Sequence, residues 1–386
     1  MEKKLVIKKN IATLTLPLTN NYGGILQAFA LQETLLELGH TTMLINIKSP
    51  THSNFKKRLE HMKQRIRKVI KNTTVFQPDF TSESDKKYIN RNVQKFIDKY
   101  IATTKEVSPY FKFDDLKEYN FESFVVGSDQ VWRPDYSYYL ANYFFEFLEN
   151  VQTVKKLSYA ASFGVENWRL TESETSKCKQ LISSFDAISV REVAAISLCE
   201  NYLATDSTMV LDPTLLVPKE KYCDLVRNAS LDKPKGNLFC YILDRSEENE
   251  RFEKNVAKSL NAEAFGVMPR KDMKNLTQHN RDEFVFPPIE EWINGFVHAD
   301  FIITDSFHGT VFAILFNKPF LSIGNAKRGL SRFSSLLNNF KLNERLILEP
   351  NKFEMQKLND EIDWDYVNSR LAQERERSLA FLINNV

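Results

Sequence analysis

A histidine with several polar neighbours lies between two apolar segments near residue 300 of this 386-residue chain. Residues 301–303 form an apolar run of the kind that buried parallel strands use, and Asp305 and Ser306 end it. His308 and Gly309 then open a predicted helix that reaches Phe316. We therefore expect His308 at the carboxyl end of a strand and in the first turn of a helix, where open α/β sheets bind their ligands.

That position would suit a reaction on an anionic substrate. The amino end of a helix attracts anions, and an imidazole can give and take protons near neutral pH. The alternative is a structural role, in which His308 only caps the helix or fills the turn.

A predicted strand–helix–strand unit near the amino end has a second polar turn. Residues 11–16 and 42–47 suit strands, and 25–38 suit a helix that Gly39 ends. The loop between them carries Gly23 and Gly24 but neither a GxGxxG nor a P-loop pattern, so it predicts no dinucleotide or ATP site. The two glycines indicate either a ligand-facing turn or a tight turn alone.

Further strands with polar ends follow along the chain. Residues 121–126 run into Gly127–Trp132, and residues 187–190 run directly into Arg191 and Glu192. A second series of strands begins at 238–243, and a helix at 289–297 follows two prolines. The pattern predicts two α/β halves with parallel sheets and a cleft between them, which suits a transferase with two substrates.

Composition narrows the class of protein. The formal net charge is only +2, and no motif typical of nucleic-acid-binding domains occurs, so we expect no nucleic-acid partner. The four cysteines lack CxxC spacing, which predicts neither a metal site nor a disulfide framework and fits a reducing cytoplasm. We find no signal-peptide core and no apolar run long enough to span a membrane.

One segment, residues 55–71, is strongly basic and also has apolar residues at helical spacing. It contains eight lysines and arginines against one acid, Glu60. Such a helix can lie peripherally on an anionic membrane at its cytoplasmic face. The alternative is a solvated helix whose apolar stripe packs on its own domain.

Six motifs together resemble the polysaccharide pyruvyl transferase family. In chain order they are NYGGILQAFALQ (21–32), VVGSDQVW (125–132), SYAASFG (158–164), SVRE (189–192), LDPTLL (211–216) and DSFHG (305–309). The resemblance implies an α/β fold of two Rossmann-like domains facing a cleft, as in the GT-B glycosyltransferases. It also implies transfer of a pyruvyl group from phosphoenolpyruvate to two hydroxyls of one sugar, as a cyclic ketal, with no cofactor and no metal.

The resemblance assigns donor-binding residues that suit a phosphate and a carboxylate. Arg191 matches the family's donor-binding arginine, and a guanidinium binds either anionic group with two hydrogen bonds. The alternative for Arg191 is a structural ion pair with an acid such as Glu192. His308 matches the family histidine and would act as the proton donor, with Gly309 beside the phosphate. Lys327 and Arg328 equally match a basic residue after the next strand, the alternative being a solvated loop.

On the acceptor side we expect Asp129 to orient or deprotonate a sugar hydroxyl, or else to hold its own turn. Asn21 and Trp132 are further acceptor candidates, although a tryptophan is more often buried. The expected acceptor is a lipid-linked repeat unit of a surface polysaccharide.

The expected domains are residues 1–217 on the acceptor side and 218–364 on the donor side. Residues 365–386 should form a helix that packs back on the first domain. Two other functions compete: a GT-B glycosyltransferase that uses a nucleotide sugar, and a non-catalytic, membrane-docked partner protein of the same fold.

Overall fold

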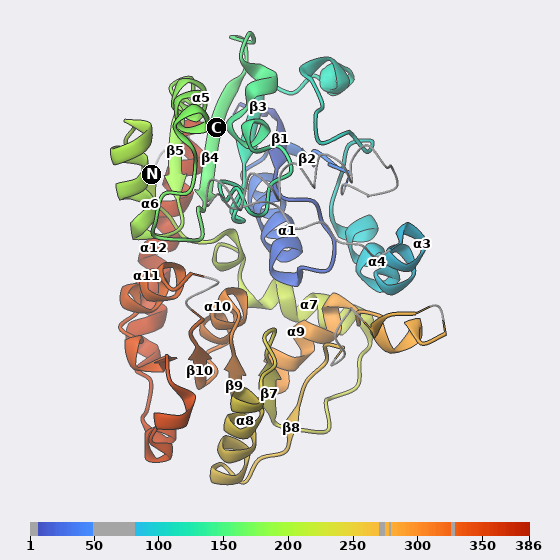
Figure 1. The fold of residues 1–386 in the computed structure, drawn as a ribbon, viewed down its shortest axis with the longest axis vertical. Helices are drawn as coiled ribbons and strands as arrows, with labels where there is room; N and C mark the ends of the chain where they lie inside the picture. The colour runs from blue at the N-terminus through green and yellow to red at the C-terminus, as the bar shows by residue number, and fades with distance from the viewer. Residues whose placement is uncertain (1–6, 49–81, 270–274, 278, 326–328) are drawn as a thin grey trace. The chain divides into compact units, whose positions relative to one another are not determined.

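The computed structural model describes residues 7–48, 82–269, 275–277, 279–325 and 329–386 (Figure 1). The chain forms two compact domains. The first comprises Met1–Tyr88, Ile97–Pro213 and Arg377–Val386, and the second comprises Ile89–Phe96 and Thr214–Glu376. The main crossing between domains therefore falls at Pro213, four residues before the boundary that the sequence suggested.

The first domain is built on a six-stranded parallel sheet in the order β2-β1-β3-β4-β5-β6. Its strands are β1 (Asn10–Leu14), β2 (Thr41–Leu44), β3 (Ser123–Val126), β4 (Lys155–Ala161), β5 (Ala187–Val190) and β6 (Thr208–Met209). All of its strand pairs are parallel. Because β1 lies between β2 and β3, the order of the strands reverses at β1 and β3.

Local sequence explains the first strand–helix–strand unit. Helix α1 (Tyr22–Glu37) begins where the Asn21 side chain accepts a hydrogen bond from the Gly24 N–H. It ends before Gly39, whose φ of +93° places it in the left-handed region that glycine tolerates best. The predicted C-terminal glycine of this helix is thus confirmed.

Two short α-helices lie between β4 and β6 along the chain. They are α5 (Glu172–Ile182) and α6 (Val193–Leu198), and a π-helical turn at Cys199–Leu203 follows the second. The core between these helices and the sheet holds Phe124, Val126, Trp132, Phe144 and Phe145, each with an exposed fraction of 1% or less.

The second domain has a five-stranded parallel sheet in the order β11-β10-β9-β7-β8. Its strands are β7 (Leu238–Tyr241), β8 (Ala264–Phe265), β9 (Phe301–Thr304), β10 (Phe320–Ile323) and β11 (Leu346–Ile347). Its helices are α7 (Lys219–Ala229), α8 (Glu247–Ser259), α9 (Ile289–His298), α10 (Phe307–Leu315) and α11 (Ser331–Asn339). Here the strand order reverses between β7 and β9. The predicted fold class, α/β with two Rossmann-like domains, is confirmed.

Two further segments of the chain pass from one domain to the other. The last helix, α12 (Trp364–Asn385), contributes Arg377–Val386 to the first domain, where Ser378 Oγ accepts a hydrogen bond from the Leu211 N–H. Residues Ile89–Phe96 belong to the second domain, because the Asn92 amide donates to the Phe286 carbonyl and the Phe286 N–H donates to the Ile89 carbonyl. These residues span the junction of α3 (Glu83–Ile89) and α4 (Arg91–Tyr100).

Three of the sequence predictions lie outside the described residues: the basic segment 55–71, Lys327 and Arg328. Across the part of the chain that the structure describes, none of the helices combines the length and the apolar character needed to cross a bilayer.

Candidate functional site

Asn21 and Asp129 meet at the reversal point of the first sheet. Asn21 follows β1 and Asp129 follows β3, and the Asn21 Nδ2 donates to Asp129 Oδ2 at 3.2 Å. The other carboxylate oxygen, Oδ1, accepts the backbone N–H of Gln130 at 2.7 Å. Open α/β sheets bind ligands at this point of reversal, so the pair occupies the expected place for a substrate.

Gly24 allows the carboxylate of Asp129 to approach the first turn of α1. A Cβ atom at Gly24 would lie 2.7 Å from Asn21 Nδ2 and 2.9 Å from Asp129 Oδ2, so these two side-chain ends would have to shift. The glycine therefore permits a close approach and does not serve a positive φ. Nearby, burial and the charge of Asp129 raise the pKa of Tyr143, which keeps its phenol neutral.

Arg191 forms a buried cluster with two residues that the sequence did not assign to it. Its Nη1 donates to Asp212 Oδ2 at 2.7 Å and to Ser128 Oγ at 3.3 Å, and Ser128 Oγ itself donates to Asp212 Oδ2 at 2.7 Å. The Arg191 and Asp212 side chains are 2% and 1% exposed. The three residues follow β5, β3 and β6, so the cluster joins three strand ends at the carboxyl edge of the sheet.

The structural ion pair considered for Arg191 exists, but its partner is Asp212 and not Glu192. Glu192 turns instead towards the end of β4, where its Oε1 accepts hydrogen bonds from Ser162 Oγ at 2.8 Å and from the N–H groups of Phe163 and Gly164, both at 3.1 Å. Neighbouring side chains along a strand point to opposite faces, which separates the two residues. Glu192 therefore shapes the turn after β4.

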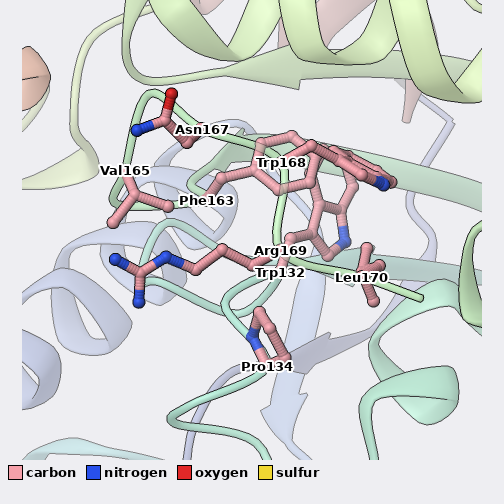
Figure 2. A pocket seen from close by; sticks show the side chains of 8 residues that line it. All are labelled: Trp132, Pro134, Phe163, Val165, Asn167, Trp168, Arg169 and Leu170. Atoms are coloured by element: carbon pink, nitrogen blue, oxygen red, sulfur yellow. The ribbon is translucent and has the colours of Figure 1, made fainter. Parts of the chain in front are cut away.

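Trp132 is a core residue, and the structure corrects the expectation that its ring is presented to a sugar. Its exposed fraction is 0%, its ring stacks on Phe144 at 5.2 Å, and its indole N–H donates to the Tyr143 carbonyl. Figure 2 shows a small pocket beside this ring. It is also lined by Phe163, Trp168 and Arg169.

The pocket is lined partly by residues that were not among the predicted site residues. Trp168 is half-buried and stacks on Tyr202 with ring centroids 4.6 Å apart. Arg169 Nη1 donates to Asp135 Oδ2 at 2.7 Å, and Asn167 at the rim is exposed. No motif marks these residues, because the segment that carries them is an irregular loop after β4.

Asp305 holds together the reversal point of the second sheet. It follows β9, and its two carboxylate oxygens accept the N–H groups of Leu243 and Asp244, which follow β7, each at 2.7 Å. Ser306 then caps α10, with its Oγ accepting the Gly309 N–H at 3.4 Å. The DSFHG motif thus begins with a clamp between two strand ends and continues with a helix cap.

His308 lies in the first turn of α10, as predicted, with an exposed fraction of 6%. The first turn of this helix contains no acidic residue, so its partial positive charge is not neutralised within the helix. Gly309 has a packing reason to be glycine, because a Cβ there would lie 2.1 Å from Thr304 Oγ1. Its N–H already donates to Ser306, so Gly309 would let a ligand come close to the helix without giving it a hydrogen bond.

The described residues contain no group of three or more His, Cys, Asp or Glu side chains arranged to hold a metal ion. Each domain places polar or charged side chains at the carboxyl edge of its parallel sheet. The first supplies a buried guanidinium and a hydrogen-bonded carboxylate, and the second supplies an imidazole at a helix start.

Comparison with solved structures finds distant likenesses over nearly the whole chain. A UDP-GlcNAc 2-epimerase from Neisseria meningitidis is 10% identical with a TM-score of 0.49, covering 97% of this chain and 100% of its own. A UDP-GlcNAc 2-epimerase from Methanocaldococcus jannaschii is 12% identical with a TM-score of 0.47, covering 96% and 99%. A glycosyltransferase from Rickettsia africae is 15% identical with a TM-score of 0.43, covering 98% and 94%.

None of the curated proteins matches the sequence. A family does match: residues 21–327 correspond to the family described as polysaccharide pyruvyl transferase. The match covers most of the chain and includes Asn21, Asp129, Arg191 and His308. The chain therefore belongs to the polysaccharide pyruvyl transferase family.

Proposed function

We propose that this protein transfers a pyruvyl group from phosphoenolpyruvate to two hydroxyls of one sugar in a surface polysaccharide, or in its lipid-linked repeat unit, and forms a cyclic ketal. The observation that carries the proposal is the place of His308, within the matched part of the chain, at the carboxyl end of β9 and the start of α10. There a proton donor stands beside a helix end that favours an anion.

The residues proposed to contact the donor are His308 and Gly309, in the first turn of α10, and Arg191, through its guanidinium. The Arg191 Nη1 bonds to Asp212 and Ser128, which fixes the orientation of the guanidinium plane. Lys327 and Arg328 remain candidates for a further cationic contact.

The proposed reaction begins with a proton transfer. His308 gives a proton to the methylene carbon of phosphoenolpyruvate, which becomes a methyl group and leaves the central carbon electrophilic. The first sugar hydroxyl adds to that carbon and loses its proton. The bond from carbon to the phosphate oxygen then breaks, the second hydroxyl adds and loses its proton, and the ketal and inorganic phosphate are the products.

The proposed acceptor contacts lie at the reversal point of the first sheet. Asp129 would accept a hydroxyl proton or orient the hydroxyl, and Asn21 would hold the carboxylate in place through its 3.2 Å hydrogen bond. In place of Trp132, the exposed Asn167 and the half-buried Arg169 beside the pocket would meet the sugar (Figure 2).

We also propose a peripheral membrane contact through residues 55–71, which would bring the protein to a lipid-linked acceptor. Replacement of its lysines and arginines by glutamine should abolish sedimentation with anionic liposomes. Unchanged sedimentation would reject this contact without affecting the proposed reaction.

The reaction is tested by following phosphate release from phosphoenolpyruvate with a panel of free and lipid-linked oligosaccharides, and by mass spectrometry of the acceptor. The product should have gained one pyruvate less one water, and in D₂O its new methyl group should carry one deuterium. His308→Gln should release no phosphate while still folding. Transfer of a sugar from a nucleotide sugar under the same conditions would instead favour the glycosyltransferase alternative.

A further inference from the structure

We propose that Arg332, together with Ser331, forms part of the phosphate-binding site in the second domain and positions the donor beside His308. This inference rests on the proposed function and adds residues to its donor site. Neither residue belongs to the six motifs that carry the family resemblance, and both lie beyond the matched residues 21–327.

The first step is the common position of two helix starts. Helices α10 and α11 follow β9 and β10, which are neighbouring parallel strands paired at Ile302 with Phe320 and at Ile303 with Leu321. Both helices therefore begin at the same edge of the sheet. A hydrogen bond of 2.6 Å between Thr310 Oγ1 and Ser322 Oγ ties the start of α10 to β10.

The second step is the contact between Arg332 and the histidine motif. The guanidinium carbon of Arg332 lies 5.5 Å from the centre of the Phe307 ring, and the His308 ring lies 5.3 Å from the same centre. The two groups thus share Phe307 as a neighbour. Arg332 is 7% exposed and His308 is 6% exposed, so an anion that reached them would move from water into less polar surroundings, in which charge interactions are stronger.

The third step concerns the start of α11. Ser331, its first residue, is 6% exposed, and its buried Oγ has no hydrogen-bond partner among the described residues. No side chain caps this helix, and its first turn contains no acid. A bound phosphate oxygen would supply the acceptor that this hydroxyl lacks.

The charges in the first turn of a third helix, α8, also favour an anion site at the starts of α10 and α11. Helix α8, which follows β7, carries Glu247, Glu248 and Glu250 in its first turn, and these disfavour an anion at that helix. Neither α10 nor α11 carries such residues. The anion site is thereby confined to the side of the sheet where β9 and β10 end.

The test is titration calorimetry of phosphoenolpyruvate into the full-length protein and its variants. Arg332→Met removes the charge and should weaken phosphoenolpyruvate binding by at least about tenfold, as expected for a charge-assisted hydrogen bond. Arg332→Lys should restore part of the affinity, and Ser331→Ala should cause a smaller loss. With an acceptor present, Arg332→Met should raise KM more than it lowers kcat.

Arg345→Met is the matched control. Arg345 is also a buried arginine of the second domain, at 5% exposed, but it precedes β11 and so lies at the opposite edge of the sheet, where it donates to the Asp360 carbonyl. Its replacement should lower the melting temperature without changing phosphoenolpyruvate affinity.

The possible failures are distinct. If the unchanged protein binds phosphoenolpyruvate and Arg332→Met binds it within about twofold, this inference is wrong and the proposed function stands. If the unchanged protein does not bind phosphoenolpyruvate at all, both fail. Should Arg332→Met not fold, Arg332→Lys decides, because an ammonium lacks the planar fork of a guanidinium and should still weaken binding.

Discussion

At the scale of single residues, two roles are considered for Arg191: binding the donor and forming a structural ion pair. Experiments can separate these two roles. A buried arginine that loses its partner, or a buried aspartate that loses its arginine, leaves an uncompensated charge. The stability of the first domain and the binding of the donor would therefore both suffer in a simple Arg191 variant, and neither effect alone would identify the role.

We predict that Arg191→Met lowers the free energy of unfolding by about 3–5 kcal/mol, because Asp212 is left charged and buried. Adding Asp212→Asn should recover most of that loss. Urea denaturation measures the stability and titration calorimetry measures phosphoenolpyruvate binding. If Arg191 binds the donor, the double variant stays unable to bind it; recovery of binding together with stability would show that Arg191 is structural only.

Gly309 provides a second residue-scale prediction. Because a Cβ at this position would lie 2.1 Å from Thr304 Oγ1, Gly309→Ala should push α10 away from β9 and lower stability by about 1–3 kcal/mol. Thermal unfolding monitored by circular dichroism measures the loss. Ala313→Ser, a small change further along the same buried helix, serves as the comparison, and an equally small effect of Gly309→Ala would contradict the packing account.

At the scale of elements, the edge of the first sheet contains a group that should make stability depend on pH. His40 precedes β2, and its burial, followed by the charge of Lys9, lowers its pKa. The Lys9 N–H donates to His40 Nδ1 at 3.3 Å, which requires an unprotonated nitrogen. The folded protein therefore binds this proton less readily than the unfolded chain does.

The sign of the effect follows from that difference. The stabilising contribution of neutral His40 is complete above the unfolded pKa of about 6.5 and is lost as pH falls through the folded pKa. We predict that His40→Gln flattens the fall in melting temperature below about pH 6.5. His279→Gln, at an exposed position, should not flatten this fall. Equal slopes of melting temperature against pH for the unchanged protein and for His40→Gln would contradict the prediction.

Element boundaries were predicted best where the apolar pattern was compact. The bounds of β5 (Ala187–Val190) match the predicted strand to the residue, because the charged residues Asp186 and Arg191 flank a short, mostly apolar run. The two-residue strand β6 escaped notice, since two residues show no period. Because β6 was not predicted, nothing indicated that Asp212 lies at the carboxyl end of a strand, close to Arg191. The ion pair between the two residues was therefore not predicted.

The burial of a side chain was harder to predict than its place in the order of strands and helices. The motif that places Trp132 after β3 carries no information on which way the ring points, and the packing of Phe144 and Phe163 around it decides that it is buried. His308 was placed correctly because a strand, a cap and a helix follow one another within a few residues. Arg332 was missed because its relation to Phe307 arises only when α11 packs against α10.

At the scale of the whole molecule, both domains place their polar residues at the carboxyl edge of a parallel sheet, at or beside the reversal of strand order. In the first domain this is where Asn21 meets Asp129, and in the second where Asp305 bridges β7 and β9. The same architecture serves nucleotide-binding proteins, so the fold alone does not choose between donors. The choice depends on which anion the residues recognise.

The most direct test of the central claim is therefore a comparison of donors by titration calorimetry on the full-length protein. Phosphoenolpyruvate, UDP and CMP are titrated separately into the unchanged protein, into His308→Ala and into the double variant Arg191→Met with Asp212→Asn. The account predicts that phosphoenolpyruvate alone binds, and that both variants bind it at least about tenfold more weakly. Binding of UDP or CMP in its place, with no heat from phosphoenolpyruvate, would contradict the account and favour the glycosyltransferase alternative.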